Sequence, residues 1–356
     1  MAPFAENLRS VRLVSDTKHD TTHVDRDLLE AQFEARIDDE WMVLTVPNGG
    51  YILGLVIQAC TLLQEGSPQP EPLYLSSQFL GSTSVGPCTI IVSRVKSGKS
   101  YVNLTAKLVQ KARLLDVSVV LLLYGKLSVA KHPYGSFPAT RNQLTLAHPS
   151  GLSRRCPISI HPSKCSTTPF ERPYTFKKHL IQAIDPYYVA KMERLASLEH
   201  AGNAESGDLG GGIFEWGGWY EMVDEGDIIT PPLISFLGDV SPLLLPQSIA
   251  AKREVPMWVP TLGLSIDFKY HVPAPGETIP GIAKRTVGIF FTSKFLIEGR
   301  HDVTAEIWTA PSAIGQGVEE PGWQDRMFCM ALVNQSATSA PAEMNLKHAV
   351  KKGSKL

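Results

Sequence analysis

One carboxylate in this chain lies where an acid is costly. Asp239 interrupts the apolar stretch FLGDVSPLLL at residues 236–245. A carboxylate buried among Leu, Phe and Val side chains is expensive unless it is hydrogen-bonded, so such a group is a candidate for chemistry. With a water molecule within hydrogen-bond reach, Asp239 could act as a general base. The structural alternative is a residue on the polar side of a helix, or one that caps a nearby turn.

A second candidate group is the backbone at the start of the apolar segment 46–64. Pro47 suits the start of a helix, and Asn48 can cap it. A helix N-terminus presents free N–H donors, and Gly49 and Gly50 would allow a substrate carbonyl oxygen to approach them closely. Equally, the two glycines would simply let the helix pack tightly against a sheet.

An internal repeat indicates how these groups are positioned. Residues 75–79 read LSSQF and residues 264–268 read LSIDF, and each copy follows an apolar helix candidate. A repeat of this kind indicates two copies of one domain. The alignment places Pro72 opposite Thr261, and the first helix contains no acid between Pro47 and its end. If one half does chemistry, we therefore expect it to be the second.

Hydrophobic periodicity predicts the same order of elements in both halves: one strand, one buried helix, then four or five strands. The helices are expected at 46–64 and 231–245. The strands are expected at 29–38, 73–83, 88–96, 101–110 and 114–129, and then at 213–223, 258–271, 278–289, 291–298, 302–309 and 326–335. Consecutive strands joined by tight turns are typical of antiparallel sheets, so the expected fold class is α+β.

A segment dense in Pro and Ser, residues 131–173, lacks periodicity and is expected to link the two domains. The N-terminal domain is then 1–130, and the C-terminal domain, which carries the presumed active site, is 174–336. Residues 337–356 are expected to form a flexible tail. That tail ends in Ser354, Lys355 and Leu356, the tripeptide read by the peroxisomal import receptor. We therefore expect a peroxisomal protein, and acyl-CoA esters are common substrates in that compartment.

Composition excludes several classes of function. The net charge is −1 with 19% charged residues, which gives no sign of a nucleic-acid partner. The longest apolar run, 117–124, is too short to span a membrane, and the N-terminus lacks a signal peptide's apolar core. Five cysteines form no CxxC pair, which favours inert thiols in a reducing compartment. No motif for a nucleotide, cofactor or metal is present, and the His19–His23 pair is best interpreted as part of a polar arm, so we expect neither cofactor nor metal.

The ordered set of motifs resembles one known family. VPNGGYILGLVIQA after a strand, SGKSYVNLTAKLVQKARLLDVSVVLL, and VPTLGLSIDFKYHVP at 259–273 are similar to segments of the TesB-like acyl-CoA thioesterases. The resemblance covers roughly residues 25–130 and 210–336. It implies a tandem double hotdog fold, in which each half is an antiparallel sheet wrapped around a central helix. It also implies an acyl-CoA substrate, and double hotdog domains commonly pair their sheet edges, so a homo-oligomer is possible.

The resemblance also implies roles for individual residues. In that family, an Asp on the second helix, a Thr that opens the next strand and a Gln on the last strand hold the attacking water. Asp239 and Thr261 match the first two positions. Alignment puts Asn334 at the third position, and Gln335 is its neighbour. Because side chains alternate along a strand, only one of them can face the site.

Three hypotheses follow. The first is a thioesterase that hydrolyses acyl-CoA to free acid and CoA, in lipid metabolism or in the biosynthesis of a secondary metabolite. The second is a biosynthetic dehydratase or isomerase, since GDVSPL at 238–243 resembles the hotdog hydratase motif GDxNPLH. That motif's His is replaced by Leu244, so this hypothesis ranks lower. The third is a non-catalytic acyl-binding protein.

Overall fold

The computed structural model describes most of both predicted domains. The described residues are 3–17, 30–110, 118–125, 155–168, 174–200, 214–240, 257–269, 272, 278–341 and 343. Leu244, the His19–His23 pair and the terminal tripeptide Ser354–Leu356 lie outside these residues. The predictions made for them therefore stay predictions.

The main strands form one 13-stranded sheet in the order β1-β2-β6-β7-β8-β5-β12-β16-β15-β13-β10-β9, with β14 paired to β15. In the first half the strands are β1 (Arg12–Thr17), β2 (Glu30–Ile37), β5 (Glu71–Phe79), β6 (Gly86–Ser97), β7 (Tyr101–Val109) and β8 (Ser118–Gly125). In the second half they are β9 (Leu180–Ile184), β10 (Phe214–Met222), β12 (Thr261–Phe268), β13 (Thr286–Ser293), β14 (Leu296–Ile297), β15 (Arg300–Thr309) and β16 (Cys329–Thr338). Neighbouring strands run antiparallel throughout, as predicted.

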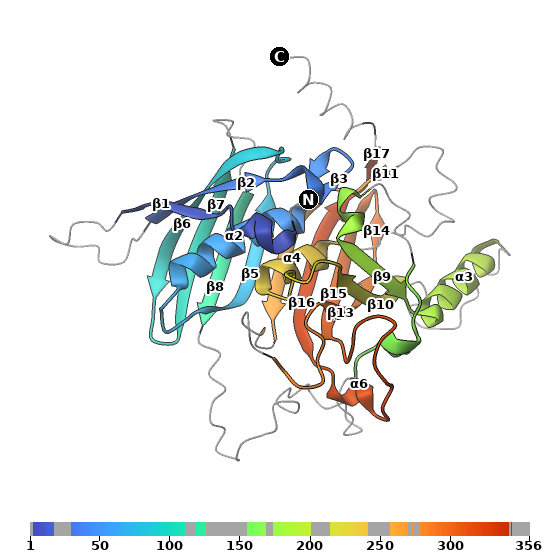
Figure 1. Ribbon diagram of the computed structural model, residues 1–356. Coiled ribbons are helices and arrows are strands. Elements are labelled where there is room, and N and C mark those ends of the chain that lie inside the picture. Colours follow the sequence, from blue (N-terminus) through green and yellow to red (C-terminus); the bar gives the residue numbers. More distant parts are fainter. Residues whose placement is uncertain are drawn as a thin grey trace.

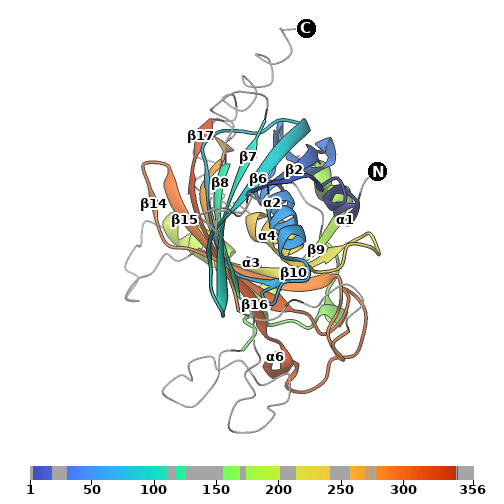
Figure 2. The ribbon, with the colours of Figure 1, turned by 90° about the vertical axis from the view of Figure 1, so that its left-hand side faces the viewer.

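Helices and two small strand pairs accompany this sheet, along with the 3-10 helices η1 (Asp39–Trp41), η3 (Pro162–Lys164) and η4 (Thr175–Lys178). The α-helices are α1 (Phe4–Leu8), α2 (Gly49–Gln64), α3 (Pro186–His200), α4 (Pro231–Asp239) and α6 (Trp323–Arg326), and the two small pairs are β3 (Met42–Val43) with β4 (Val46–Pro47) and β11 (Met257–Trp258) with β17 (Ala340–Pro341). The sheet curves around α2 and α4, which lie together on its concave side (Figures 1 and 2). The prediction of two antiparallel halves, each wrapped around a central helix, is confirmed.

The repeated sequence forms the seam between the halves. Strands β5 and β12 pair so that Ser76 faces Ser265, and these two serines occupy equivalent positions in LSSQF and LSIDF. The halves are thus related by a pseudo-two-fold axis that passes close to this pair. The hydroxyl of Ser77 donates a hydrogen bond of 2.8 Å to the carbonyl of Leu264 across the seam. The two predicted sheets are therefore one continuous sheet, which fixes the two central helices relative to each other.

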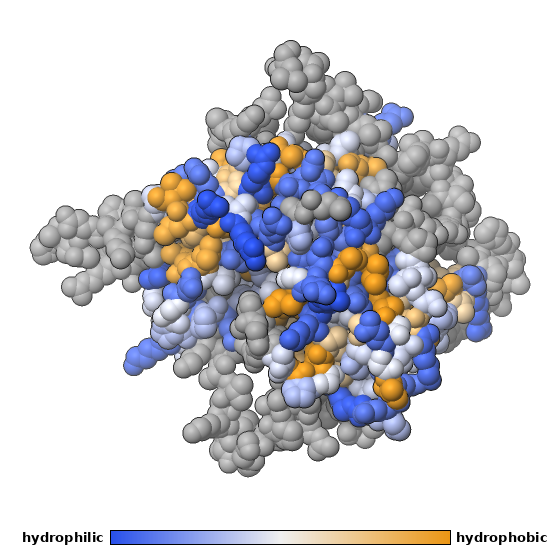
Figure 3. Space-filling model, viewed as in Figure 1, coloured by the Kyte–Doolittle hydropathy of each residue, from blue (hydrophilic) through white to orange (hydrophobic). Residues whose placement is uncertain are grey.

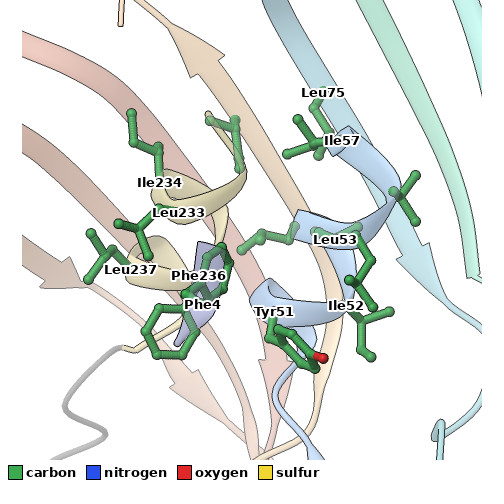
Figure 4. Packing of buried hydrophobic residues seen from close by; sticks show 14 of the residues in the cluster. Phe4, Tyr51, Ile52, Leu53, Ile57, Leu75, Leu233, Ile234, Phe236 and Leu237 are labelled. Atoms are coloured by element: carbon green, nitrogen blue, oxygen red, sulfur yellow. The ribbon is translucent and has the colours of Figure 1, made fainter. Parts of the chain in front are cut away.

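The two central helices pack closely because α2 begins with glycine. A Cβ atom on Gly50 would lie 2.2 Å from the carbonyl oxygen of Ser235 and 2.6 Å from the Cβ of Asp239, so only glycine fits. The Ser235 hydroxyl donates to the Gly50 carbonyl at 2.8 Å. Figure 4 shows the apolar side chains of α2 and α4 packed together, with Phe4 of α1 against Phe236. The start of α2 is thereby held against the end of α4.

Caps fix where the central helices begin. The Oδ1 atom of Asn48 accepts from the backbone N–H of Tyr51 at 2.9 Å, so α2 starts at Gly49 rather than at residue 46. Thr230 caps α4 in the same way, through the N–H of Leu233. Both helices are largely buried, as predicted. The second helix was predicted to run on to residue 245, but it ends at Asp239 with Val240 as its C-cap; residues 241–245 lie outside the described residues.

The strand predictions differ from the structure most clearly between residues 278 and 298. One strand, β13, spans Thr286–Ser293, where two were predicted with a break after 289. The predicted start fails because Pro280 and Gly281 form a turn, with Gly281 at a φ of 74°. Glu298 and Gly299 make the tight turn into β15, with positive φ angles of 49° and 80°.

Part of the predicted linker packs against the second half. Cys156 and Ile158 are buried in a hydrophobic cluster with Trp219, Trp308 and Trp323. Residues 155–168 therefore behave as part of the C-terminal domain. In addition, the first residues of the predicted tail are ordered, since Ala340–Pro341 pairs with β11.

A buried histidine joins the two halves away from the seam. His179 hydrogen-bonds through Nε2 to Glu40 at 2.7 Å and through Nδ1 to Asp224 at 2.8 Å. Its ring stacks on Trp41, with centroids 5.0 Å apart. The imidazole therefore links Glu40 of the first half to Asp224 of the second. This bridge adds a polar link to the apolar contact of α2 with α4.

The exposed face in Figure 3 mixes polar and apolar side chains, and the apolar ones form separate patches. Among the described residues, no helix has the length and apolar character needed to cross a membrane. All five cysteines lie in the described part of the chain, and none of them is in a disulfide. Burial raises the pKa of the Cys88 thiol to about 12 and that of Cys165 to about 11, which keeps both thiols protonated and unreactive at neutral pH.

Candidate active site

The last residue of α4, Asp239, is the centre of a hydrogen-bonded cluster. Its Oδ1 atom accepts from the Thr261 hydroxyl at 2.9 Å and from the Gln335 Nε2 at 2.7 Å. Its Oδ2 atom accepts from the backbone N–H of Gly50 at 2.8 Å. The same Gln335 nitrogen lies 2.5 Å from the Thr261 oxygen. Two side chains widely separated in sequence, together with the first turn of α2, thus surround the Asp239 carboxylate.

Strand register brings the two side chains from the sheet to the carboxylate. In β12 and β16, Thr261 pairs with Ala337 and Leu264 pairs with Gln335. The register shifts between Thr261 and Gly263, a bulge that re-aims the first residue of β12. As a result, the Thr261 hydroxyl and the Gln335 amide reach the same carboxylate oxygen.

The structure places only one of the two candidate amides in this cluster. Gln335 is buried on the inner face of β16, whereas Asn334 is exposed and accepts a hydrogen bond from Thr304 at 3.2 Å on the outer face. Alternation along the strand separates them, and the buried residues Val333 and Ala337 fix which face is inward. Asn334 therefore lies outside the cluster, although the sequence alignment put it at the Gln position.

The Asn48 side chain and the Gly50 backbone N–H make hydrogen bonds within the protein, whereas the sequence suggested that this region could bind a substrate carbonyl. Asn48 uses its side chain to cap the helix. The N–H of Gly50 is bonded to the Asp239 carboxylate, and the backbone of Gly49 favours the same charged form. The expected role as donors to a substrate carbonyl is therefore not supported for Gly50, while tight packing is. No feature of the sequence links Gly50 to Asp239, because the contact joins two domains.

Two opposing effects set the acidity of Asp239. Its carboxylate is enclosed by protein although the residue as a whole is half-buried, and this desolvation raises the pKa to about 6. Hydrogen bonds from Gly50, Thr261 and Gln335 favour the charged form and limit the rise. The positive end of the α2 dipole acts in the same direction. Asp239 is therefore a carboxylate at neutral pH that is more basic than an ordinary aspartate.

This arrangement suits activation of a water molecule. A general base works best when its pKa lies near the working pH, and Asp239 is close to that condition. Thr261 donates to the carboxylate and accepts from Gln335, so its hydroxyl is fixed in one orientation. Among the described residues, no group of three or more His, Cys, Asp or Glu side chains is arranged to bind a metal.

Part of the first half matches a known family model. Residues 37–125 match the family model of the acyl-CoA thioesterase N-terminal domain. The resemblance to the TesB-like acyl-CoA thioesterases is confirmed. No curated protein sequence gives a significant match.

Solved structures similar to this chain extend over almost its whole length. A hot dog fold protein of unknown function from Alicyclobacillus acidocaldarius has a TM-score of 0.60 and 14% identity, and the match covers 95% of this chain and 97% of that one. Acyl-CoA thioesterase II TesB2 from Mycobacterium marinum has a TM-score of 0.53 and 14% identity, with 95% and 98% covered. At this identity the likeness establishes the double hotdog fold and leaves the reaction to be argued from the site.

Proposed function

We propose that the protein is an acyl-CoA thioesterase that hydrolyses its substrate by direct attack of water. The observation that carries this proposal is the carboxylate of Asp239, which is held by Gly50, Thr261 and Gln335 and has a raised pKa of about 6. The match of the first half to an acyl-CoA thioesterase domain supports the choice of substrate.

In the proposed reaction, Asp239 removes a proton from a bound water as the water oxygen attacks the thioester carbon. A C–O bond forms, and the carbonyl pair moves onto oxygen. Collapse of this intermediate breaks the C–S bond, and the proton held by Asp239 passes to the departing CoA sulfur. The products are the free acid and CoA, and Asp239 is again a carboxylate. Thr261 and Gln335 hold the carboxylate, and with it the attacking water, in position.

Neighbouring residues on β16 offer a matched test. Gln335→Met removes the buried amide with little change of volume, and Asn334→Leu does the same on the outer face. Thiol release from a panel of acyl-CoAs, with the acid product quantified, is measured for both. We expect kcat to fall roughly ten- to a hundredfold for Gln335→Met, because a hydrogen bond to a charged group is lost, and to stay within about twofold for Asn334→Leu. Equal effects of the two substitutions, or an enoyl product without thiol, would contradict the proposal.

We further propose that the protein acts in peroxisomes. The terminal tripeptide Ser354-Lys355-Leu356 supports this location. A fluorescent protein fused to the N-terminus of the full chain is expected to co-localise with a peroxisomal marker and to become diffuse when the three residues are deleted. An unchanged distribution after the deletion would overturn the proposed location.

A further inference from the structure

The inner face of the sheet carries unpartnered polar atoms beside the Asp239 cluster. Both ring nitrogens of His301 are buried without a well-formed hydrogen bond in the described part of the chain, although the Gly299 backbone lies close enough to favour the charged ring, and the residue is only 7% exposed. In the same described part, the Oε1 atom of Gln335 and the hydroxyl of Ser339 are also buried without a partner. Buried polar groups in proteins are nearly always hydrogen-bonded, so each unpartnered group needs an explanation.

Strand register places His301 next to the proposed catalytic residues. His301 of β15 and Thr261 of β12 both pair with Ala337, one from each side of β16. Two strand spacings, about 10 Å, therefore separate the backbones of Thr261 and His301. Gln335 pairs with Val303, the next inward residue after His301, so His301 and Gln335 are diagonal neighbours.

The side chain between these residues is small. The residue that separates Thr261 from His301 is Ala337, which has the smallest side chain that a strand commonly carries there. Further along the inner face the positions become fully apolar, with Val303, Ala305 and Val333 in the main hydrophobic core. On β15 and β16, His301 and Gln335 thus lie toward the end of the face that holds Asp239.

The unpartnered atoms of His301 and Gln335 are complementary to a neutral group that forms hydrogen bonds. Burial lowers the pKa of His301, against weaker opposing effects of the Gly299 backbone and Asp302, so the ring is neutral at pH 7. A neutral imidazole offers one donor and one acceptor, and the free Gln335 oxygen is an acceptor. Hydroxyl and amide groups, which both donate and accept, match this set. A charged substrate group does not match this set, because Asp239 is the only charged side chain among these residues.

We propose that His301, with the free oxygen of Gln335, forms a subsite for a neutral hydrogen-bonding group of the substrate close to the thioester. This inference rests on the proposed thioesterase function, since it is the reaction at Asp239 that locates the thioester. Two parts of an acyl-CoA carry such a group at a similar distance: a hydroxyl on the third acyl carbon, and the first amide of the CoA arm. In either case His301 determines which substrates are used well and does not take part in bond breaking.

Two pairs of substrates distinguish the sources. The first pair is a 3-hydroxyacyl-CoA and the plain acyl-CoA of equal length. The second pair is a plain acyl thioester of N-acetylcysteamine and the same acyl thioester of an alkanethiol of equal length, which lacks the amide. Each is assayed with the wild type, His301→Phe and His301→Gln. Val303→Ala serves as a control that disturbs packing on the same strand without removing a polar group.

The expected result is a loss of preference. The wild type should prefer the polar member of at least one pair in kcat/KM, and His301→Phe should reduce that preference roughly tenfold, because about one hydrogen bond is lost. His301→Gln should restore part of it, and Val303→Ala should lower both members of each pair alike. If His301→Phe reduces the preference within the first pair, His301 binds the acyl hydroxyl. If it reduces the preference within the second pair, His301 binds the amide of the CoA arm.

The inference would be overturned if His301→Phe changed all four substrates equally, or none of them. Failure of the proposed function is a separate outcome, in which the wild type releases no thiol from any substrate. In that case equilibrium binding of the same four thioesters, which the protein then leaves intact, measured with the wild type and His301→Phe, still decides the subsite. Equal affinities of the two members within both pairs for the wild type would then contradict it.

Discussion

The raised pKa of Asp239 predicts that activity and stability change in opposite directions with pH. The folded protein holds this proton up to a pH of about 6, whereas an unfolded chain releases it at an ordinary aspartate pKa, 3.8. The stability contributed by the protonated form is therefore fully present below the unfolded value and is lost as the pH rises through 6. Activity needs the carboxylate, so kcat/KM rises over the same range.

The magnitude follows from the two pKa values. A shift of about two units corresponds to roughly 3 kcal/mol in total, of which roughly 1 to 2 kcal/mol is lost between pH 5 and pH 8. Over that interval kcat/KM should increase about tenfold and level off above pH 7, because roughly a tenth of Asp239 is ionised at pH 5.

Asp239→Asn provides the reference, since it does not titrate. Free energies of unfolding are measured by urea denaturation at several pH values between 5 and 8 for the wild type and the variant. The difference between them isolates the contribution of this one carboxylate from that of all other groups. We expect the wild type to lose stability relative to the variant as the pH rises. A difference that is constant with pH, together with a flat kcat/KM profile from pH 5 to 7, would refute the reasoning.

Two further substitutions test how the halves are held together. Gly50→Ala should destabilise the protein by roughly 1 to 3 kcal/mol and lower kcat, because the added Cβ would meet the Ser235 carbonyl oxygen at 2.2 Å. Gly226→Ala is the control and should change little, because nothing lies within reach of a Cβ atom there. Equal unfolding midpoints for the two variants would contradict the packing argument. His179→Phe should destabilise the protein by roughly 1 to 3 kcal/mol, because Glu40 and Asp224 lose their shared hydrogen-bond partner while Glu40 keeps its contact with Lys178. Thermal unfolding measures this loss, and an unchanged melting temperature would show that the bridge is not stabilising.

Much of the fold could be predicted from local patterns. The alternation in residues 30–37 and the capped apolar run that begins at Asn48 identify a strand and a buried helix without any tertiary information. The repeat LSSQF and LSIDF predicted the duplication, and it turned out to mark the seam itself. The start of the strand predicted at 278–289 was wrong, because the prediction gave β propensity more weight than the turn signal of Pro280 and Gly281.

The site could be predicted only in part. Asp239 stood out because an acid interrupts an apolar run, but its partners depend on register and on contacts between domains. The choice between Asn334 and Gln335 required knowledge of which face of β16 is inward, and a shift of one residue reverses that choice. The contact of Gly50 with Asp239, and the place of His301 beside Thr261, arise only when distant segments are assembled.

The most direct test of the central claim is thiol release from acyl-CoA at pH 8 by the wild type and by Asp239→Asn, both shown to be folded. If Asp239 activates the attacking water, the variant should lose roughly a hundred- to ten-thousandfold in kcat, and the free acid should appear in equal amount to CoA in the wild type. A folded variant that releases thiol at the wild-type rate would show that the water is activated elsewhere and would contradict the account.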